Sequence, residues 1–81
     1  METQLLYFAA LAEALHQTGE TLNLEPGITG QGLLDLLAGR YPDQRLIIQA
    51  CSLAQNEEFL GLAETLTPGA TTALLPPVSG G

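Results

Sequence analysis

Short apolar segments, each followed by turn-forming residues, are the feature that most limits what this chain can fold into. The longest apolar run, from Leu5 to Ala12, has eight residues, whereas a membrane-spanning helix needs roughly 20. Pro and Gly recur between the apolar segments, so every predicted element is short. With 81 residues and no internal repeat or linker, the sequence predicts one small domain.

The hydrophobic period changes within the first part of the chain. Residues 4–8 form an apolar run with two aromatics, which predicts a first strand. Residues 9–17 have helical spacing, and we expect this helix to end at Gly19, which can adopt the left-handed conformation. Residues 21–25 then alternate between polar and apolar, which predicts a half-buried second strand.

A longer helix is predicted from Thr29, a good N-cap residue type, to about Arg40, and Pro42 ends it. One broad apolar stripe is expected on this helix, made of Leu33, Leu34, Leu36 and Leu37.

The second half of the chain predicts three more strands. Residues 46–51 have a pattern that is ambiguous between helix and strand. We favour a strand at 51–55, a turn at Asn56-Glu57, a short return strand at 59–60, a type II turn at 67–70 and a last strand at 71–75.

The predicted order favours an α+β fold in which one main helix crosses a mixed sheet, the β-grasp or ubiquitin-like arrangement. We expect residues 1–75 to form the β-grasp domain. Residues 76–81, Pro-Pro-Val-Ser-Gly-Gly, are expected to form a flexible, extended C-terminal tail.

The charge balance excludes several classes of partner. Nine acidic residues face two arginines and no lysine, which gives a net charge of −7. A phosphate backbone is bound by neutralising it with Lys and Arg, so we expect no nucleic-acid or membrane partner and favour a basic protein surface. The single Cys51 predicts a reducing, cytoplasmic location, and the lack of early Lys or Arg argues against a signal peptide.

No catalytic or metal-binding constellation emerges from the sequence. Ser52 and Ser79 lack a nucleophile-elbow context, and His16 is the only conventional base, without a second metal ligand at a suitable spacing. We therefore expect neither a metal site nor an intrinsically bound cofactor, and no catalysis by this chain alone. His16 is expected to be a solvated helix residue, and Cys51 a small buried hydrophobe.

The C-terminal residues are the most unusual part of the sequence. Pro76 and Pro77 have fixed φ angles and offer no N–H, so they predict a stiff arm after the last strand. Six extended residues reach roughly 20 Å. Gly80 and Gly81 lack side chains and could pass a narrow channel into another protein's active site; the competing interpretation is a frayed terminus.

Several motifs resemble the ubiquitin-like sulfur-carrier family, which includes the small subunit of molybdopterin synthase. The tail carries the resemblance most strongly, supported by Leu6-Tyr7-Phe8-Ala9, Gly39-Arg40-Tyr41-Pro42, Asn56, Leu66 and Gly69. The resemblance implies that an E1-like enzyme uses Mg and ATP to adenylate the carboxylate of Gly81. A sulfurtransferase or cysteine desulfurase then supplies the sulfur of a thiocarboxylate.

The same resemblance implies how the sulfur is used. The tail would insert into the large catalytic subunit, where its sulfur builds the dithiolene of molybdopterin from cyclic pyranopterin monophosphate. Two small and two large subunits would form a heterotetramer. The residues of insertion would be Pro76, Pro77, Val78, Ser79 and Gly80, and those of the contact face Phe8, Phe59 and Leu75.

Two other functions stay open. The chain could carry sulfur for thiamine or another sulfur-containing product, or it could be a non-catalytic β-grasp interaction module or protein modifier. Phe8 and Phe59 are equally compatible with a core position and with an interface.

Overall fold

The computed structural model describes residues 1–77, so Val78, Ser79, Gly80 and Gly81 lie outside the described residues. The elements follow the chain in the order β1 (Glu2–Tyr7), α1 (Ala9–Leu15), β2 (Gly19–Asn23), α2 (Gly30–Arg40), η1 (Pro42–Gln44), α3 (Arg45–Gln49), β3 (Ser52–Gln55), β4 (Glu58–Leu60) and β5 (Thr72–Leu75).

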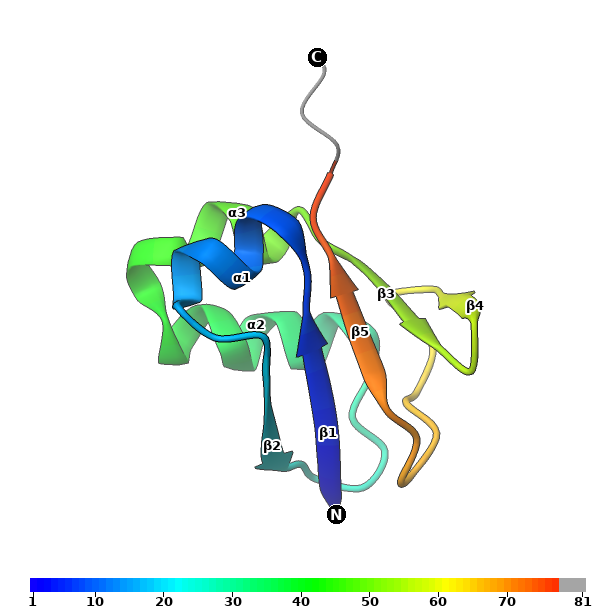
Figure 1. The fold of residues 1–81 in the computed structure, drawn as a ribbon. Helices are drawn as coiled ribbons and strands as arrows, with labels where there is room; N and C mark the ends of the chain where they lie inside the picture. Colours follow the sequence, from blue (N-terminus) through cyan, green and yellow to red (C-terminus); the bar gives the residue numbers. More distant parts are fainter. Residues whose placement is uncertain (78–81) are drawn as a thin grey trace.

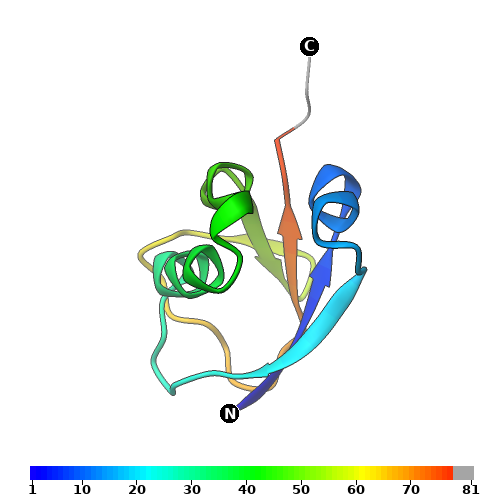
Figure 2. The same ribbon diagram turned by 90° about the vertical axis from the view of Figure 1, so that its left-hand side faces the viewer.

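The five strands form one mixed sheet in the order β2-β1-β5-β3-β4. β1 pairs antiparallel with β2 and parallel with β5, and β3 pairs antiparallel with both β5 and β4. α2 and α3 lie on one side of the sheet, and α1 lies near the end at which β1 and β5 finish (Figures 1 and 2). The predicted β-grasp fold is confirmed. Of the helices in the described part of the chain, none has both the length and the apolar character to cross a membrane.

Strict alternation along β1 determines which side of the sheet is buried. Thr3, Leu5 and Tyr7 are buried and the residues between them are exposed. In a strand, successive side chains point to opposite faces, so one face of β1 packs into the core and the other stays open. The buried apolar residues are Leu5, Tyr7, Leu11, Leu24, Leu33, Leu34, Leu37, Ala38, Ile48, Cys51, Leu53, Leu66 and Leu74.

The cap of α2 confirms one prediction, and its apolar stripe corrects another. The Thr29 hydroxyl accepts a hydrogen bond from the Gly32 N–H at 3.0 Å, as an N-cap does. Leu33, Leu34 and Leu37 are buried as predicted, but Leu36 is 39% exposed. At 3.6 residues per turn, Leu36 falls outside the arc shared by the other leucines, so the predicted stripe was too wide.

The end of α1 was predicted wrongly. The helix ends at Leu15, and the exposed His16, with φ 56°, takes the left-handed conformation expected of Gly19. Gly19 instead opens β2, opposite Leu6 of β1. A Cβ at Gly19 would lie 2.4 Å from the Leu5 carbonyl oxygen. Glycine is thus required there by close approach of two strands, and β2 begins two residues earlier than predicted.

The ambiguous segment at 46–51 is helical up to Gln49, and the strand begins only after the segment. α3 spans Arg45–Gln49 and buries Ile48, while Leu46 on the same helix is 86% exposed. The predicted strand then starts at Ser52 rather than Cys51. Five residues are too few to show a helical period against a strand period, which explains the ambiguity.

Both predicted turns are confirmed. Gly69 has φ +80°, and the Ala70 N–H donates to the Thr67 carbonyl oxygen at 3.3 Å, as in a type II turn. Between β3 and β4, Asn56 and Glu57 have φ values of 52° and 66°. Two consecutive left-handed residues form the type I′ turn that matches the twist of a hairpin.

A polar network joins the second strand to the main helix. The hydroxyls of Tyr7 and Tyr41 both donate to Glu20 Oε2 at 2.5 Å, and Arg40 lies 3.8 Å from the other carboxylate oxygen. Burial, together with the hydrogen bond to Glu20, raises the pKa of Tyr7 well above its usual value. The network therefore depends on a protonated Tyr7.

We predict that Tyr7→Phe lowers the free energy of unfolding at neutral pH by about 1–2 kcal/mol, because Glu20 loses a buried donor. The unfolded chain ionises Tyr7 near pH 10.0, whereas burial keeps the hydroxyl protonated to a higher pH in the folded chain, so the stabilisation that this tyrosine gives is lost as the pH rises above 10.0. Urea denaturation from pH 7 to 11 should therefore show the two stability curves converging. Parallel curves would contradict the role of the Tyr7 hydroxyl.

We predict that Glu57→Gly raises the free energy of unfolding by about 0.5–1 kcal/mol, because glycine adopts a positive φ without the steric cost of a Cβ. Glu58→Gly is the matched control, since Glu58 lies in β4 and glycine weakens a strand. Urea denaturation of both variants measures the difference. A loss of stability in Glu57→Gly as large as that in Glu58→Gly would refute the prediction.

Candidate functional site

The base of the C-terminal tail lies at the centre of the sheet. β5 runs between β1 and β3, with Leu74 fully buried and Leu75 half-buried. Pro76 and Pro77 then lead away from the body of the domain, and Pro77 is exposed (Figure 1). Because β5 is paired on both sides, the position at which the tail begins is fixed by the sheet. The roles predicted for Val78, Ser79, Gly80 and Gly81 fall on residues outside the described part.

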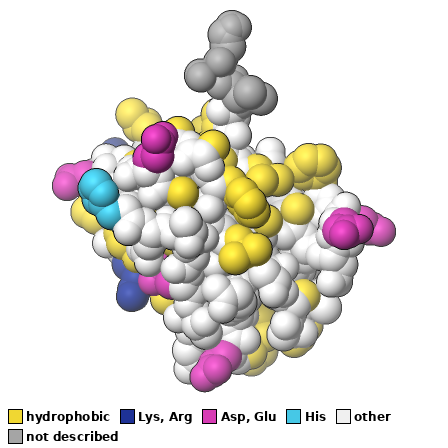
Figure 3. All heavy atoms as spheres, in the orientation of Figure 1, with side chains coloured by type: hydrophobic (Ala, Val, Ile, Leu, Met, Phe, Trp, Pro, Cys, Tyr) yellow, Lys and Arg dark blue, Asp and Glu magenta, His cyan; other side chains and the backbone are white. Residues whose placement is uncertain are grey.

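An apolar row crosses the open face of the sheet. Leu6 of β1 is in register with Ala73 of β5, Ala73 with Ala54 of β3, and Ala54 with Phe59 of β4. Neighbours in register point to the same face, so these four side chains form one line on the side opposite the buried Leu5 and Leu53. Figure 3 looks onto this face and shows the apolar side chains extending across it.

The three predicted contact residues lie on this same face. Phe8 continues the extended backbone of β1, so its side chain follows the alternation of Leu6, and it is 43% exposed. Phe59 is 77% exposed. Leu75, two residues beyond Ala73, is half-buried. We call this set the open-face patch: Leu6, Phe8, Ala54, Phe59, Ala73 and Leu75.

The core interpretation of Phe8 and Phe59 is wrong, because both side chains are exposed. An exposed apolar patch is a typical feature of surfaces that bind other molecules. The contact face predicted from the sequence did not include Leu6, Ala54 and Ala73. Their positions follow from strand alternation once the pairing of β1, β5 and β3 is known, but that pairing is long-range and no local pattern reports it.

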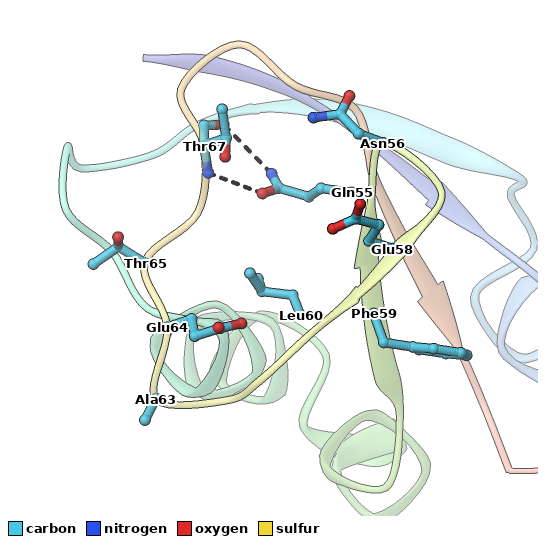
Figure 4. Close-up of a pocket in the computed structure, with 9 residues that line it drawn as sticks. All are labelled: Gln55, Asn56, Glu58, Phe59, Leu60, Ala63, Glu64, Thr65 and Thr67. Carbon is cyan, nitrogen blue, oxygen red and sulfur yellow. Dashed lines mark hydrogen bonds between the residues drawn. The ribbon is translucent and has the colours of Figure 1, made fainter.

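Apart from the open-face patch, the domain has a concave region between the β3–β4 hairpin and the loop that follows β4 (Figure 4). The Gln55 amide donates to Thr72 Oγ1 at 2.9 Å and accepts from the Thr67 N–H at 2.8 Å. The Glu64 carboxylate accepts from the Gly61 N–H at 2.7 Å. The Gln55 bonds hold the later part of the loop against the hairpin, and the Glu64 bond closes a turn within the loop, so we assign this groove a structural role. Within residues 1–77, no group of three or more His, Cys, Asp or Glu side chains could hold a metal ion.

Cys51 is a buried structural residue, as predicted. It is 5% exposed, and its thiol donates to the Ile47 carbonyl oxygen at 3.3 Å. Burial raises the pKa of the thiol to about 11. Because the thiolate is the reactive form, this side chain is a poor nucleophile at neutral pH and does not form part of the site.

These features define a class of protein: a β-grasp domain with an open apolar face and a C-terminal segment that leaves from the central strand. Residues 5–81 match the ThiS family. The chain therefore belongs to the ThiS family.

Relatives are similar over the full length. The molybdopterin synthase sulfur carrier subunit of Chlamydomonas reinhardtii is 30% identical, with 100% of both chains covered. The protein of the same name from Mycobacterium tuberculosis is 32% identical, with 100% of this chain and 99% of that protein covered. Among solved structures, SAMP1 from Haloferax volcanii has a TM-score of 0.80 and 27% identity, with 100% of both chains covered.

We predict that Phe59→Ala changes the free energy of unfolding by less than about 1 kcal/mol, because the exposed ring is outside the core. Leu53→Ala, on the neighbouring strand but fully buried, should cost about 2–5 kcal/mol. Urea denaturation compares the two truncations. Equal losses would mean that Phe59 is a core residue.

Proposed function

We propose that this chain is a sulfur carrier for molybdopterin synthesis. The observation that carries the proposal is its full-length similarity to two molybdopterin synthase sulfur carrier subunits, at 30% and 32% identity. The β-grasp domain, the Pro-Pro-Val-Ser-Gly-Gly end and the open-face patch are all consistent with it. The domain holds and presents the end of the chain, and other proteins perform the chemistry.

Activation takes place at Gly81. A carboxylate is a poor acyl electrophile, so an E1-like activating enzyme uses Mg-ATP to convert it to an acyl-adenylate with release of pyrophosphate. The persulfide of a sulfurtransferase or cysteine desulfurase then displaces AMP to give an acyl disulfide, and a thiol cleaves its S–S bond to release the thiocarboxylate, with the enzyme cysteine left in a disulfide with that thiol. ATP and Mg belong to the activating enzyme, and this chain holds no cofactor of its own.

Delivery depends on the tail and on the open-face patch. Pro76 and Pro77 direct the chain away from the sheet, and Val78, Ser79 and Gly80 bring the thiocarboxylate of Gly81 into the large subunit of molybdopterin synthase. There the sulfur is transferred to cyclic pyranopterin monophosphate, and acid–base groups of the large subunit catalyse the transfer. Phe8, Phe59 and Leu75 anchor the two subunits together, since aromatic and aliphatic side chains dominate protein interfaces.

We predict that incubation with the cognate activating enzyme, Mg-ATP and a sulfur donor increases the intact mass by about 16 Da, the exchange of one oxygen for sulfur. Deleting Gly80 and Gly81 should abolish the gain. Pro77→Ala is the matched control, because it changes the tail but keeps Gly80, Gly81 and the carboxylate of Gly81. An unchanged mass of the full chain under conditions that thiocarboxylate a known carrier would overturn the proposal.

A protein-modifier function is the second candidate, favoured by the similarity to SAMP1, a small archaeal modifier protein. A modifier would be recovered joined through Gly81 to lysines of other proteins, whereas a carrier is recovered as a free chain.

The binding partners also distinguish a carrier for molybdopterin synthesis from a carrier for thiamine synthesis. Recovery of a thiazole synthase in place of a molybdopterin synthase large subunit would favour thiamine synthesis.

A further inference from the structure

The open face contains a hollow, because small side chains lie between large ones in the row that crosses the strands. In the row described above, Leu6 and Phe59 stand at the ends and Ala73 and Ala54 in the middle. The two alanines lie on adjacent strands in direct register, so the surface dips between the larger neighbours. Leu6, Ala54 and Ala73 line this hollow, together with Asn56, Glu57 and Thr71. Its floor is apolar, and its one charged lining residue is Glu57.

Glu57 has a backbone conformation that is unfavourable for a residue with a Cβ. Its φ of 66° is in the left-handed region, where a residue with a Cβ is less stable than glycine by about 1 kcal/mol. Within residues 1–77, the Glu57 carboxylate takes part in none of the side-chain hydrogen bonds or ion pairs. The fold therefore places an exposed carboxylate beside an apolar hollow with no described internal contact that compensates for the strain.

The chemistry of the hollow specifies its occupant. An arginine or lysine side chain has an aliphatic stem that packs on apolar surface and a cationic head that remains at the polar edge. A stem of this kind would pack against Ala54 and Ala73, and its head would meet the carboxylate of Glu57, which lines the same hollow. This chain's own arginines lie elsewhere: Arg40 is beside Glu20, and Arg45 begins α3.

We infer that the hollow receives an arginine or lysine side chain of the large subunit, and that Glu57 is the charge that selects it. The inference rests on the proposed function, because it places this contact inside the same docking face as Phe8 and Phe59. It adds a directional, charged contact to an interface whose other members are apolar, and such contacts give specificity and orientation.

Glu58 provides a matched control. It has the same charge, is exposed and is adjacent in sequence. It pairs with Gln55, whose side chain is buried on the helix side, so Glu58 points away from the open face. Figure 4 shows it beside Gln55 in the polar groove. Removing either charge changes the net charge equally, so only a local contact separates the two variants.

The test is calorimetric titration of the cognate large subunit with the full chain, Glu57→Gln and Glu58→Gln at two salt concentrations. We expect Glu57→Gln to raise Kd about 5- to 10-fold and to reduce its salt dependence. Glu58→Gln should change Kd less than about twofold. Ala54→Leu, which fills the hollow, should also weaken binding while the charge of Glu57 is retained.

The outcomes test the contact at the hollow and the proposed function separately. If the unmodified chain binds and the two glutamine variants are weakened equally, the hollow is not the selecting contact, although the proposed function stands. Undiminished binding by Ala54→Leu would also overturn the inference, provided that circular dichroism shows a native fold. If the unmodified chain does not bind the large subunit, both the proposed function and this inference fail.

Discussion

The parallel pairing of β1 with β5 is the interaction on which the rest of this structure depends. It joins the first strand to the last, with Leu5 opposite Thr72 and Tyr7 opposite Leu74. Long-range pairings of this kind are costly in loop-closure entropy, so burial of Leu5, Tyr7 and Leu74 under the helices has to offset that cost. Once the pair is formed, the end of β5 is fixed at the centre of the sheet, and Pro76 and Pro77 leave from a defined point.

The same register gives the sheet two surfaces with different uses. Most residues that alternate inward, among them Leu5, Leu53 and Leu74, are large and apolar and form the core with α2. The residues that alternate outward include the open-face patch, in which Ala54 and Ala73 are small while Leu6 and Phe59 are large. A surface of this kind adds little to stability, but it provides a shape that a partner can recognise. The turn residue Glu57 likewise contributes to the surface rather than to stability, because it keeps a carboxylate where glycine would be more stable.

Local patterns predicted the parts of the fold that local physics determines. The Thr29 cap, the type II turn around Gly69 and the hairpin turn at Asn56 are each set by a few neighbouring residues, and the sequence was sufficient for them. The predictions failed where tertiary contacts decide: Gly19 is needed against Leu5, not at a helix end. For the site, Phe8, Phe59 and Leu75 came from family resemblance, but the hollow required the strand register that only the fold supplies.

Sulfur transfer from the end of this chain is the central claim, and reconstitution tests it most directly. The purified thiocarboxylated chain would be mixed with the cognate large subunit and cyclic pyranopterin monophosphate, with no other source of sulfur. The account predicts that the dithiolene of molybdopterin forms and that the chain returns to its carboxylate mass, with one thiocarboxylate consumed for each sulfur transferred. Unchanged pterin substrate in the presence of a chain that keeps its thiocarboxylate would contradict it.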